Sequence, residues 1–105
     1  MSECSIILTT YPDKASARKI AKLLVEKRLA ACVQLFPIES VYSWKNEICE
    51  EKETMLFIKS RTELFGEISA AIKENHYHKV PEIVRVPIAD GLPDYLKWIG
   101  ECVES

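Results

Sequence analysis

The chain has 105 residues, is 48% hydrophobic and carries a formal net charge of −2, so we expect one domain, residues 1–105, with a real core. The nearly balanced charge argues against nucleic-acid binding, which needs a basic face. The first residues form no signal peptide and no stretch reaches the roughly 20 apolar residues that span a bilayer, which predicts a soluble, cytoplasmic protein without membrane contact.

The first third of the chain predicts a strand, a helix and a second strand. Ser5–Thr9 is apolar on both faces, as expected of a central strand. Asp13 suits a helix N-cap. Ala31–Phe36 is a second strand, and Pro37 is expected to interrupt its ladder with a bulge or a bend. Between the strands, four residues follow the i, i+3, i+4, i+7 spacing of an amphipathic helix: Ala17, Ile20, Ala21 and Leu24.

A long hairpin follows, centred on Trp44-Lys45-Asn46-Glu47. Its second strand, Ile48–Ser60, contains no Pro or Gly and would span about 43 Å at 3.3 Å per residue. A compact domain of this size has a diameter of about 33 Å. The tip should therefore project past the domain, where its backbone groups and the rings of Tyr42 and Trp44 need a partner. This indicates that the chain is a subunit of an assembly.

The last part of the chain predicts a helix, a strand and a final helix. Ser60–Glu63 fits an S-x-x-E capping box before a helix that should end near Asn75, a residue that tolerates the left-handed conformation. A loop at His76–Pro81 leads to a fourth strand, Ile83–Val86. The inner positions expected for the two helices are Phe65, Ile68 and Ile72 in the first, and Leu96, Ile99 and Val103 in the second.

The predicted order is β-α-β-β-α-β-α, an α+β protein. Its first six elements form the ferredoxin-like arrangement, an antiparallel sheet with two helices on one face. The last helix is an addition, and the long hairpin would serve assembly. This fold hosts many unrelated activities, so it does not determine function.

The four cysteines are widely spread, with no C-x-x-C pair. In a reducing compartment we expect buried free thiols, with Cys32 the most protected. Cys49 near the hairpin tip is the candidate for reactivity or metal contact.

Six segments keep an order and spacing that point to one family: Thr9–Asp13, Leu29–Val33, Val41–Trp44, Ile58–Ser60, His76–Ile83 and Asp94–Ile99. Together they closely resemble the CutA family, the CutA1-like divalent-cation tolerance proteins, over essentially the whole chain. The resemblance implies a ferredoxin-like subunit that forms a tight homotrimer through its long strands. It also implies kinship with PII signalling proteins, trimers that bind effectors between subunits.

The loop after the second helix contains the candidate metal ligands. The family loop usually reads H-P-Y-x-x-P-E; His76, Pro81 and Glu82 match it, whereas Tyr77 and His78 replace Pro and Tyr. Residues two apart in an extended segment point to the same side, so His76 and His78 could converge on one ion. Glu82 would complete a set of two nitrogens and one oxygen suited to Cu(II), Zn(II) or Ni(II). In the alternative reading, His76 hydrogen-bonds to backbone and His78 is solvated.

Four further residues are candidates for the interface or the inter-subunit cleft. Tyr42 and Trp44 would anchor the trimer, because aromatic side chains dominate such cores. Lys59 ends a buried-looking strand, so it should either meet an anion or carboxylate such as Glu82 in the cleft, or extend out to solvent. Pro81 is expected to fix the loop.

These features favour a non-enzymatic trimer that responds to metal ions and binds a divalent cation or small anionic effector in inter-subunit clefts, with no required cofactor. The alternative is a PII-like regulator that docks on a partner protein. An enzyme is disfavoured because no nucleophile–base motif or phosphate loop is present. RNA binding is disfavoured because an aromatic RNP-type motif is missing.

Overall fold

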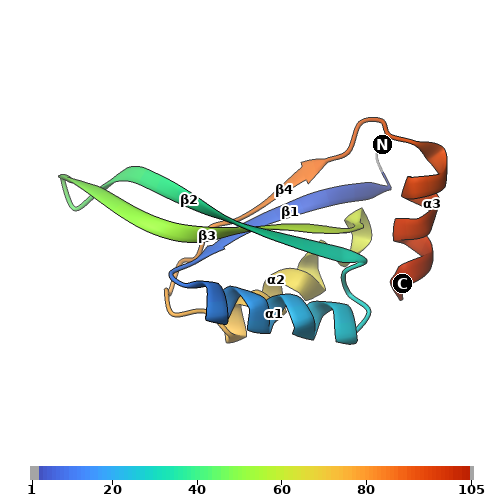
Figure 1. The fold of residues 1–105 in the computed structure, drawn as a ribbon, viewed down its shortest axis with the longest axis horizontal. Helices are drawn as coiled ribbons and strands as arrows, with labels where there is room; N and C mark the ends of the chain where they lie inside the picture. Colours follow the sequence, from blue (N-terminus) through green and yellow to red (C-terminus); the bar gives the residue numbers. More distant parts are fainter. Residues whose placement is uncertain (1–2, 105) are drawn as a thin grey trace.

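A computed structural model describes residues 3–104 and shows an α+β protein. Its sheet is antiparallel with strand order β2-β3-β1-β4. Helices α1 and α2 cover one face of this sheet, and α3 lies at the end away from the long hairpin (Figure 1). The predicted ferredoxin-like order with an added C-terminal helix is confirmed. The elements are β1 (Cys4–Tyr11), α1 (Lys14–Glu26), β2 (Cys32–Trp44), β3 (Glu47–Arg61), a 3-10 turn (Thr62–Leu64), α2 (Phe65–Glu74), β4 (Ile83–Pro87) and α3 (Pro93–Cys102).

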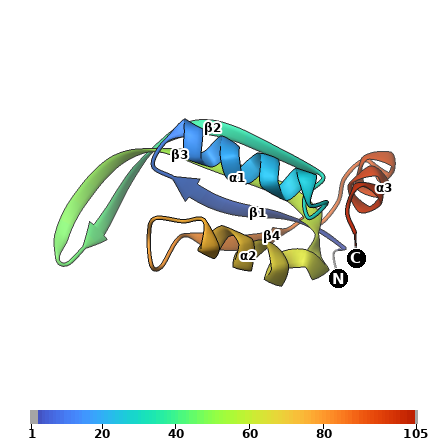
Figure 2. The same cartoon turned by 90° about the horizontal axis from the view of Figure 1, so that it is seen from below.

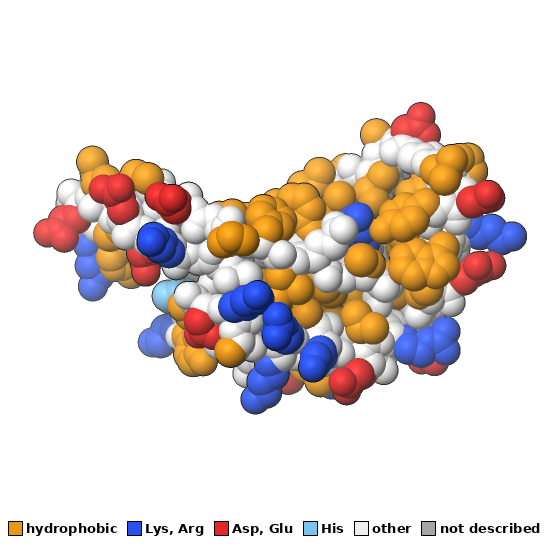
Figure 3. Space-filling model, in the orientation of Figure 1, with side chains coloured by type: hydrophobic (Ala, Val, Ile, Leu, Met, Phe, Trp, Pro, Cys, Tyr) orange, Lys and Arg blue, Asp and Glu red, His pale blue; other side chains and the backbone are white. Residues whose placement is uncertain are grey.

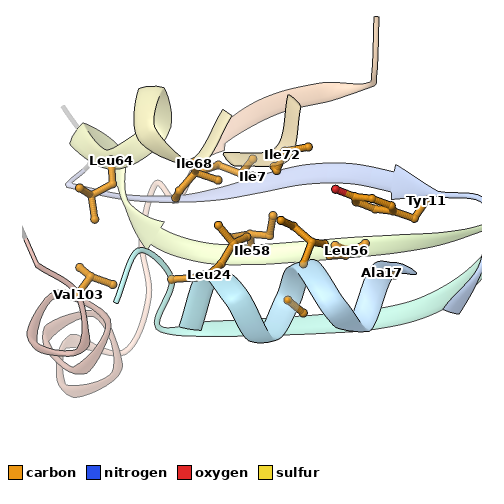
Figure 4. Packing of buried hydrophobic residues seen from close by; sticks show 13 residues of the cluster. Ile7, Tyr11, Ala17, Leu24, Leu56, Ile58, Leu64, Ile68, Ile72 and Val103 are labelled. Carbon is orange, nitrogen blue, oxygen red and sulfur yellow. The ribbon is translucent and has the colours of Figure 1, made fainter. Parts of the chain in front are cut away.

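The core fills the space between the sheet and the two covering helices (Figure 4). Leu56 and Ile58 of β3 point toward α1, and Ile7 of the central strand β1 lies beneath α2. All three are fully buried, and burying such a side chain contributes roughly 1.5–3 kcal/mol. The predicted inner faces of α1 and α2 are confirmed by the buried residues Ala17, Ile20, Ala21 and Leu24 and by Ile68 and Ile72.

The start of α1 is capped as predicted. The Asp13 carboxylate accepts a hydrogen bond from the Ser16 backbone N–H at 2.7 Å. This bond and a second one, donated by the Ser16 hydroxyl at 3.0 Å, hold the pKa of the Asp13 carboxyl below its ordinary value. The cap satisfies one of the N–H groups that a helix leaves unpaired at its first turn.

The predicted capping box before α2 is wrong. Strand β3 continues to Arg61, so Ser60 faces the core and its hydroxyl donates to the Leu29 carbonyl at 2.6 Å. Glu63 instead pairs with Arg61 at 2.6 Å. Helix α2 ends next to Asn75 as expected, but the φ of that residue is −118°, so the left-handed ending is also wrong.

The hairpin is regular along its whole length. Strands β2 and β3 keep one register from Cys32–Lys59 to Trp44–Glu47, without a slip at Pro37. The predicted bulge is therefore wrong: β2 is an edge strand, where a proline nitrogen that faces outward removes no ladder bond. The two strands do curve together toward the tip (Figure 2). Lys45 and Asn46 both have positive φ, which defines the two-residue type I′ turn that matches the strand twist.

The tip of the hairpin extends beyond the rest of the sheet, as predicted. Strand β1 pairs with β3 only between Thr54 and Arg61, so Glu47–Glu53 pair with β2 alone. The molecule is accordingly elongated, with extents of 44 × 26 × 22 Å (Figure 1). We call the two-stranded segment, residues 38–53, the ribbon. Such a ribbon is only marginally stable by itself.

Within residues 3–104 no cysteine is paired in a disulfide, but the burial of the cysteines differs from expectation. Cys4 is the buried one, and burial is the main cause that raises the pKa of its thiol. Cys32 is only half-buried, because its position in β2 points away from α1 and α2. The expectation that Cys32 is the most protected thiol is wrong for the single chain.

Two substitutions test the corrected start of α2. Ser60→Ala should lower the free energy of unfolding by about 1–3 kcal/mol, because it leaves the part-buried Leu29 carbonyl without its donor. Glu63→Ala should cost less than about 1 kcal/mol, since it removes only a partly exposed ion pair. Urea denaturation at one fixed protein concentration measures both. Equal losses of unfolding free energy in the two variants would instead support the capping box.

Candidate functional site

The sequence-predicted site residues lie in three places: the loop after α2, the uncovered face of the sheet, and the hairpin ribbon. The loop is anchored by His76, whose ring packs against Tyr11 with centroids 4.5 Å apart. Burial raises the pKa of the Tyr11 hydroxyl to about 12. His76 therefore stands at the end of β1, against the rim of the core.

Both ring nitrogens of His76 have backbone partners. Nε2 lies 2.7 Å from the Thr10 carbonyl oxygen, and Nδ1 lies 3.1 Å from the backbone nitrogen of His78. Because a carbonyl only accepts and an amide N–H only donates, the ring must carry its proton on Nε2 and accept at Nδ1. The neutral imidazole thus ties the loop to β1 and leaves no free nitrogen for a metal ion.

The proposed metal set does not come together in the single chain. The rings of His76 and His78 are 5.4 Å apart at their centroids, but no hydrogen bond or ion pair joins Glu82 to either of them. Within residues 3–104, no three His, Cys, Asp or Glu side chains are grouped closely enough to hold a metal ion. Since both His76 nitrogens are used, these residues do not fit a resident metal as they stand. The alternative reading, with His76 bonded to backbone, describes this loop.

A groove that sequence reasoning missed lies between α1 and the end of α2. It has a volume of about 490 Å³, and its rim carries Lys19 and Lys22 from α1 and Glu74 from α2. At one end, the Tyr77 hydroxyl and the Ser16 hydroxyl are 3.1 Å apart and hydrogen-bonded. The only sequence signal was the departure of Tyr77 from the family loop pattern. A groove of this size and mixed charge can hold a small polar molecule.

The side of the sheet opposite α1 and α2, which we call the open face, is mostly apolar. Strand register and alternation place these residues there. Hydrophobic side chains gather over the sheet and α3 (Figure 3). Val84 and Val86 remain 46% and 47% exposed, and Phe36 packs edge-on against Phe57 with centroids 5.0 Å apart. The open face consists of Ile6, Leu8, Cys32, Gln34, Phe36, Met55, Phe57, Lys59, Val84 and Val86.

Lys59 is the basic residue of the open face. Its Nζ lies 3.3 Å from the Tyr95 hydroxyl and 5.3 Å from the centre of the Tyr95 ring, which stacks on Trp98. The expected pairing with Glu82 is not made within the chain. Lys59 therefore has a neutral phenol and an aromatic ring as partners, with no carboxylate paired to it in the described residues.

The ribbon displays the two predicted interface aromatics. Trp44 is 62% exposed, and the Lys45 ammonium lies 5.9 Å from its ring centre. The Tyr42 hydroxyl donates to Glu51 across the ribbon. Both rings are available to a partner in the single chain, and their interface role stays a prediction.

As for a bilayer, none of the described helices has the length and apolar character needed to cross it.

Comparison with known proteins places the chain among divalent-cation tolerance proteins. Residues 5–102 match the family described as CutA1 divalent ion tolerance protein. The divalent-cation tolerance protein CutA of Thermus thermophilus is 44% identical over 91% of this chain and 94% of its own length, and that of Archaeoglobus fulgidus is 41% identical over 95% and 98%. The crystal structure of CutA1 from Shewanella sp. SIB1 superimposes with a TM-score of 0.95 at 40% identity, covering 99% of this chain and 98% of that one.

The backbone bonds of His76 predict how the loop responds to substitution. His76→Gln keeps a donor for the Thr10 carbonyl, but its acceptor oxygen is one bond farther from the main chain than Nδ1, so the His78 N–H loses its bond and should exchange its hydrogen at least about tenfold faster. His78→Ala is the matched control, because it retains the backbone N–H and should leave that exchange within about twofold. Amide hydrogen exchange by NMR measures both. Unchanged protection in His76→Gln would contradict the assigned tautomer.

Proposed function

The chain belongs to the CutA1 divalent ion tolerance protein family, and we propose that it acts in divalent-cation tolerance as a non-catalytic homotrimer. The family name describes tolerance and not a reaction, which supports a binding role. The name leaves open what the protein binds and how it assembles. The features of this chain bear on both.

The observation that carries the proposal is an open face joined to an overhanging ribbon. One side of the sheet is completed by α1 and α2, whereas the other exposes valines and partly buried aromatics. Contiguous apolar surface of this kind marks an interaction site, and the unpaired edges of a ribbon favour strand pairing. A trimer that packs open faces together, with each ribbon on a neighbour, would cover both.

We further propose that the ligand, a divalent cation or a small anion, binds in clefts between subunits. The loop set His76, His78 and Glu82 does not fit a metal within one chain, so a cation would need groups from more than one subunit. The exposed side chain of His78 and the charged rim of the groove supply polar groups at the surface. No resident cofactor is required for such a role.

A PII-like regulator that docks on a partner protein is the second candidate. The engagement of both His76 nitrogens favours it, because an organic effector does not need a free imidazole lone pair. Effector-dependent capture of one defined partner would support this candidate over simple ion binding.

Assembly gives the first test of the proposed function. Light scattering at micromolar concentration should yield three times the 12.0 kDa subunit mass. Trp44→Ala should lower the thermal midpoint and make it depend on protein concentration, because subunit binding stabilises the folded state by mass action. Val25→Ala truncates an apolar side chain of α1 that is 44% exposed, and it should have no such effect. A monomeric wild-type protein would refute the trimer.

Copper titration tests the metal assignment. We expect His76→Ala combined with Glu82→Gln to bind Cu(II) within about threefold of wild type, or roughly 0.7 kcal/mol, because neither His76 nitrogen is available. Calorimetry on both proteins, with Mg(II) as a control for weak carboxylate binding, gives the comparison. A loss of tenfold or more in the double variant, with the trimer intact, would make the loop the copper site.

A further inference from the structure

A positive charge stands in an apolar setting on the open face. By register, Lys59 lies beside Cys32 on β2 and Ile6 on β1, and Phe57 precedes it on the same side of β3. The partners of its ammonium group are the Tyr95 hydroxyl and ring. Covering this face with a second subunit would take the ammonium out of water. A buried cation without an opposite charge costs several kcal/mol, so the covering subunit should bring a carboxylate.

The strand alternation limits the carboxylates that could fill this role. Glu47, Glu51 and Glu53 project from the open side of the ribbon, and Glu82 directly precedes the edge strand β4. Glu51 and Glu53 already accept hydrogen bonds from Tyr42 and Ser40. Glu47 is at the tip of the ribbon. Glu82 is exposed, makes no hydrogen bond or ion pair with any described residue, and stands beside β4, an edge strand.

The two charges cannot reach each other within one chain. Lys59 is level with Ile6 of β1, while Glu82 precedes Ile83, which is level with Thr9. They are therefore separated by at least about 10 Å along the strands and, with β1 between β3 and β4, about another 10 Å across them. A closed ring of three subunits needs two different patches on each chain, one to give and one to receive. Lys59 and Glu82 occupy two such separate places.

We infer that Lys59 of each subunit pairs with Glu82 of a neighbouring copy, so that a closed trimer contains three identical ion pairs. This inference rests on the proposed trimer and names the charged contact that its interface contains. It also explains why a lysine is placed among apolar residues: the lysine and the carboxylate are each incomplete until a second copy docks.

Charge reversal on separate chains tests the pair. Lys59→Glu and Glu82→Lys should each weaken the trimer at least about tenfold in a dilution series, because each places like charges together in all three interfaces. The two variants are then dissociated, mixed and examined by native mass spectrometry. Mixed trimers should exceed the 1:3:3:1 ratio expected by chance, because only a mixed trimer contains interfaces in which positions 59 and 82 carry opposite charges. The double variant K59E/E82K should recover wild-type dissociation.

The controls separate this inference from the proposed trimer. Lys73→Glu changes the same charge on the exposed surface of α2 and should mix statistically with wild type. If circular dichroism shows that a charge-reversed variant does not fold, Lys59→Met and Glu82→Gln serve as milder replacements. Each should weaken the trimer, and the double variant should lose less than the sum of the two single losses. Statistical mixing or additive losses in a trimeric protein would overturn the pair and leave the trimer standing. Recovery by Glu51→Lys or Glu53→Lys in place of Glu82→Lys would also overturn it, whereas a monomeric wild type would remove the proposed function itself.

Discussion

Strand β3 is longer than the sheet to which it belongs, and the rest of the structure depends on this mismatch. From Thr54 to Arg61 it has a partner on both sides and lies over the core, so it is held by cross-strand bonds and by buried side chains such as Leu56 and Ile58. Before Thr54 it has β2 alone. A two-stranded ribbon gains little from its own hydrogen bonds in water, because the strands exchange protein–water bonds for protein–protein ones. The sequence nevertheless keeps this ribbon in a single register with a type I′ turn, which makes sense if another subunit completes it.

The period-two alternation of the strands gives the two faces of the sheet different tasks. The side chains facing α1 and α2 are largely buried: aliphatic residues pack there beside the small hydroxyl side chains of Ser5, Thr9 and Ser60, and burial of the aliphatic residues stabilises the fold of the single chain. The open face is less regular: it mixes valines and phenylalanines with a glutamine, a cysteine and Lys59. Interfaces between subunits commonly mix an apolar centre with polar groups that set register and orientation. The composition of the open face resembles such an interface more than it resembles a second folding core.

What could be predicted from the sequence was local or periodic. The inner face of α1 and the Asp13 cap depend on residues within one or two turns, and the projecting hairpin depends on strand length alone. The capping-box error and the incomplete picture of the loop after α2 both involved partners distant in the chain. Ser60 carries a capping-box spacing, yet its hydroxyl donates to a carbonyl on the segment before β2. The role of His76 depends on the Thr10 carbonyl, and the groove next to His76 lies between two helices, α1 and α2. Spacing in a sequence can suggest metal ligands, but it cannot show that their lone pairs are already used.

The hydrogen bonds of both His76 ring nitrogens bear on where a single chain could bind a cation. A metal site built within one chain would need free donors held close together, whereas here the imidazole that matches the family loop is part of the scaffold that joins the loop to β1. Among the described residues, Lys59 and Glu82 are two charged groups without an opposite charge, and they lie apart, one on the open face and the other beside β4. Polar groups left incomplete in a subunit become effective only when assembly brings a neighbour's groups to them. In the proposed trimer, ligand binding would depend on the oligomeric state, because donors that are missing from one chain would be supplied by the next.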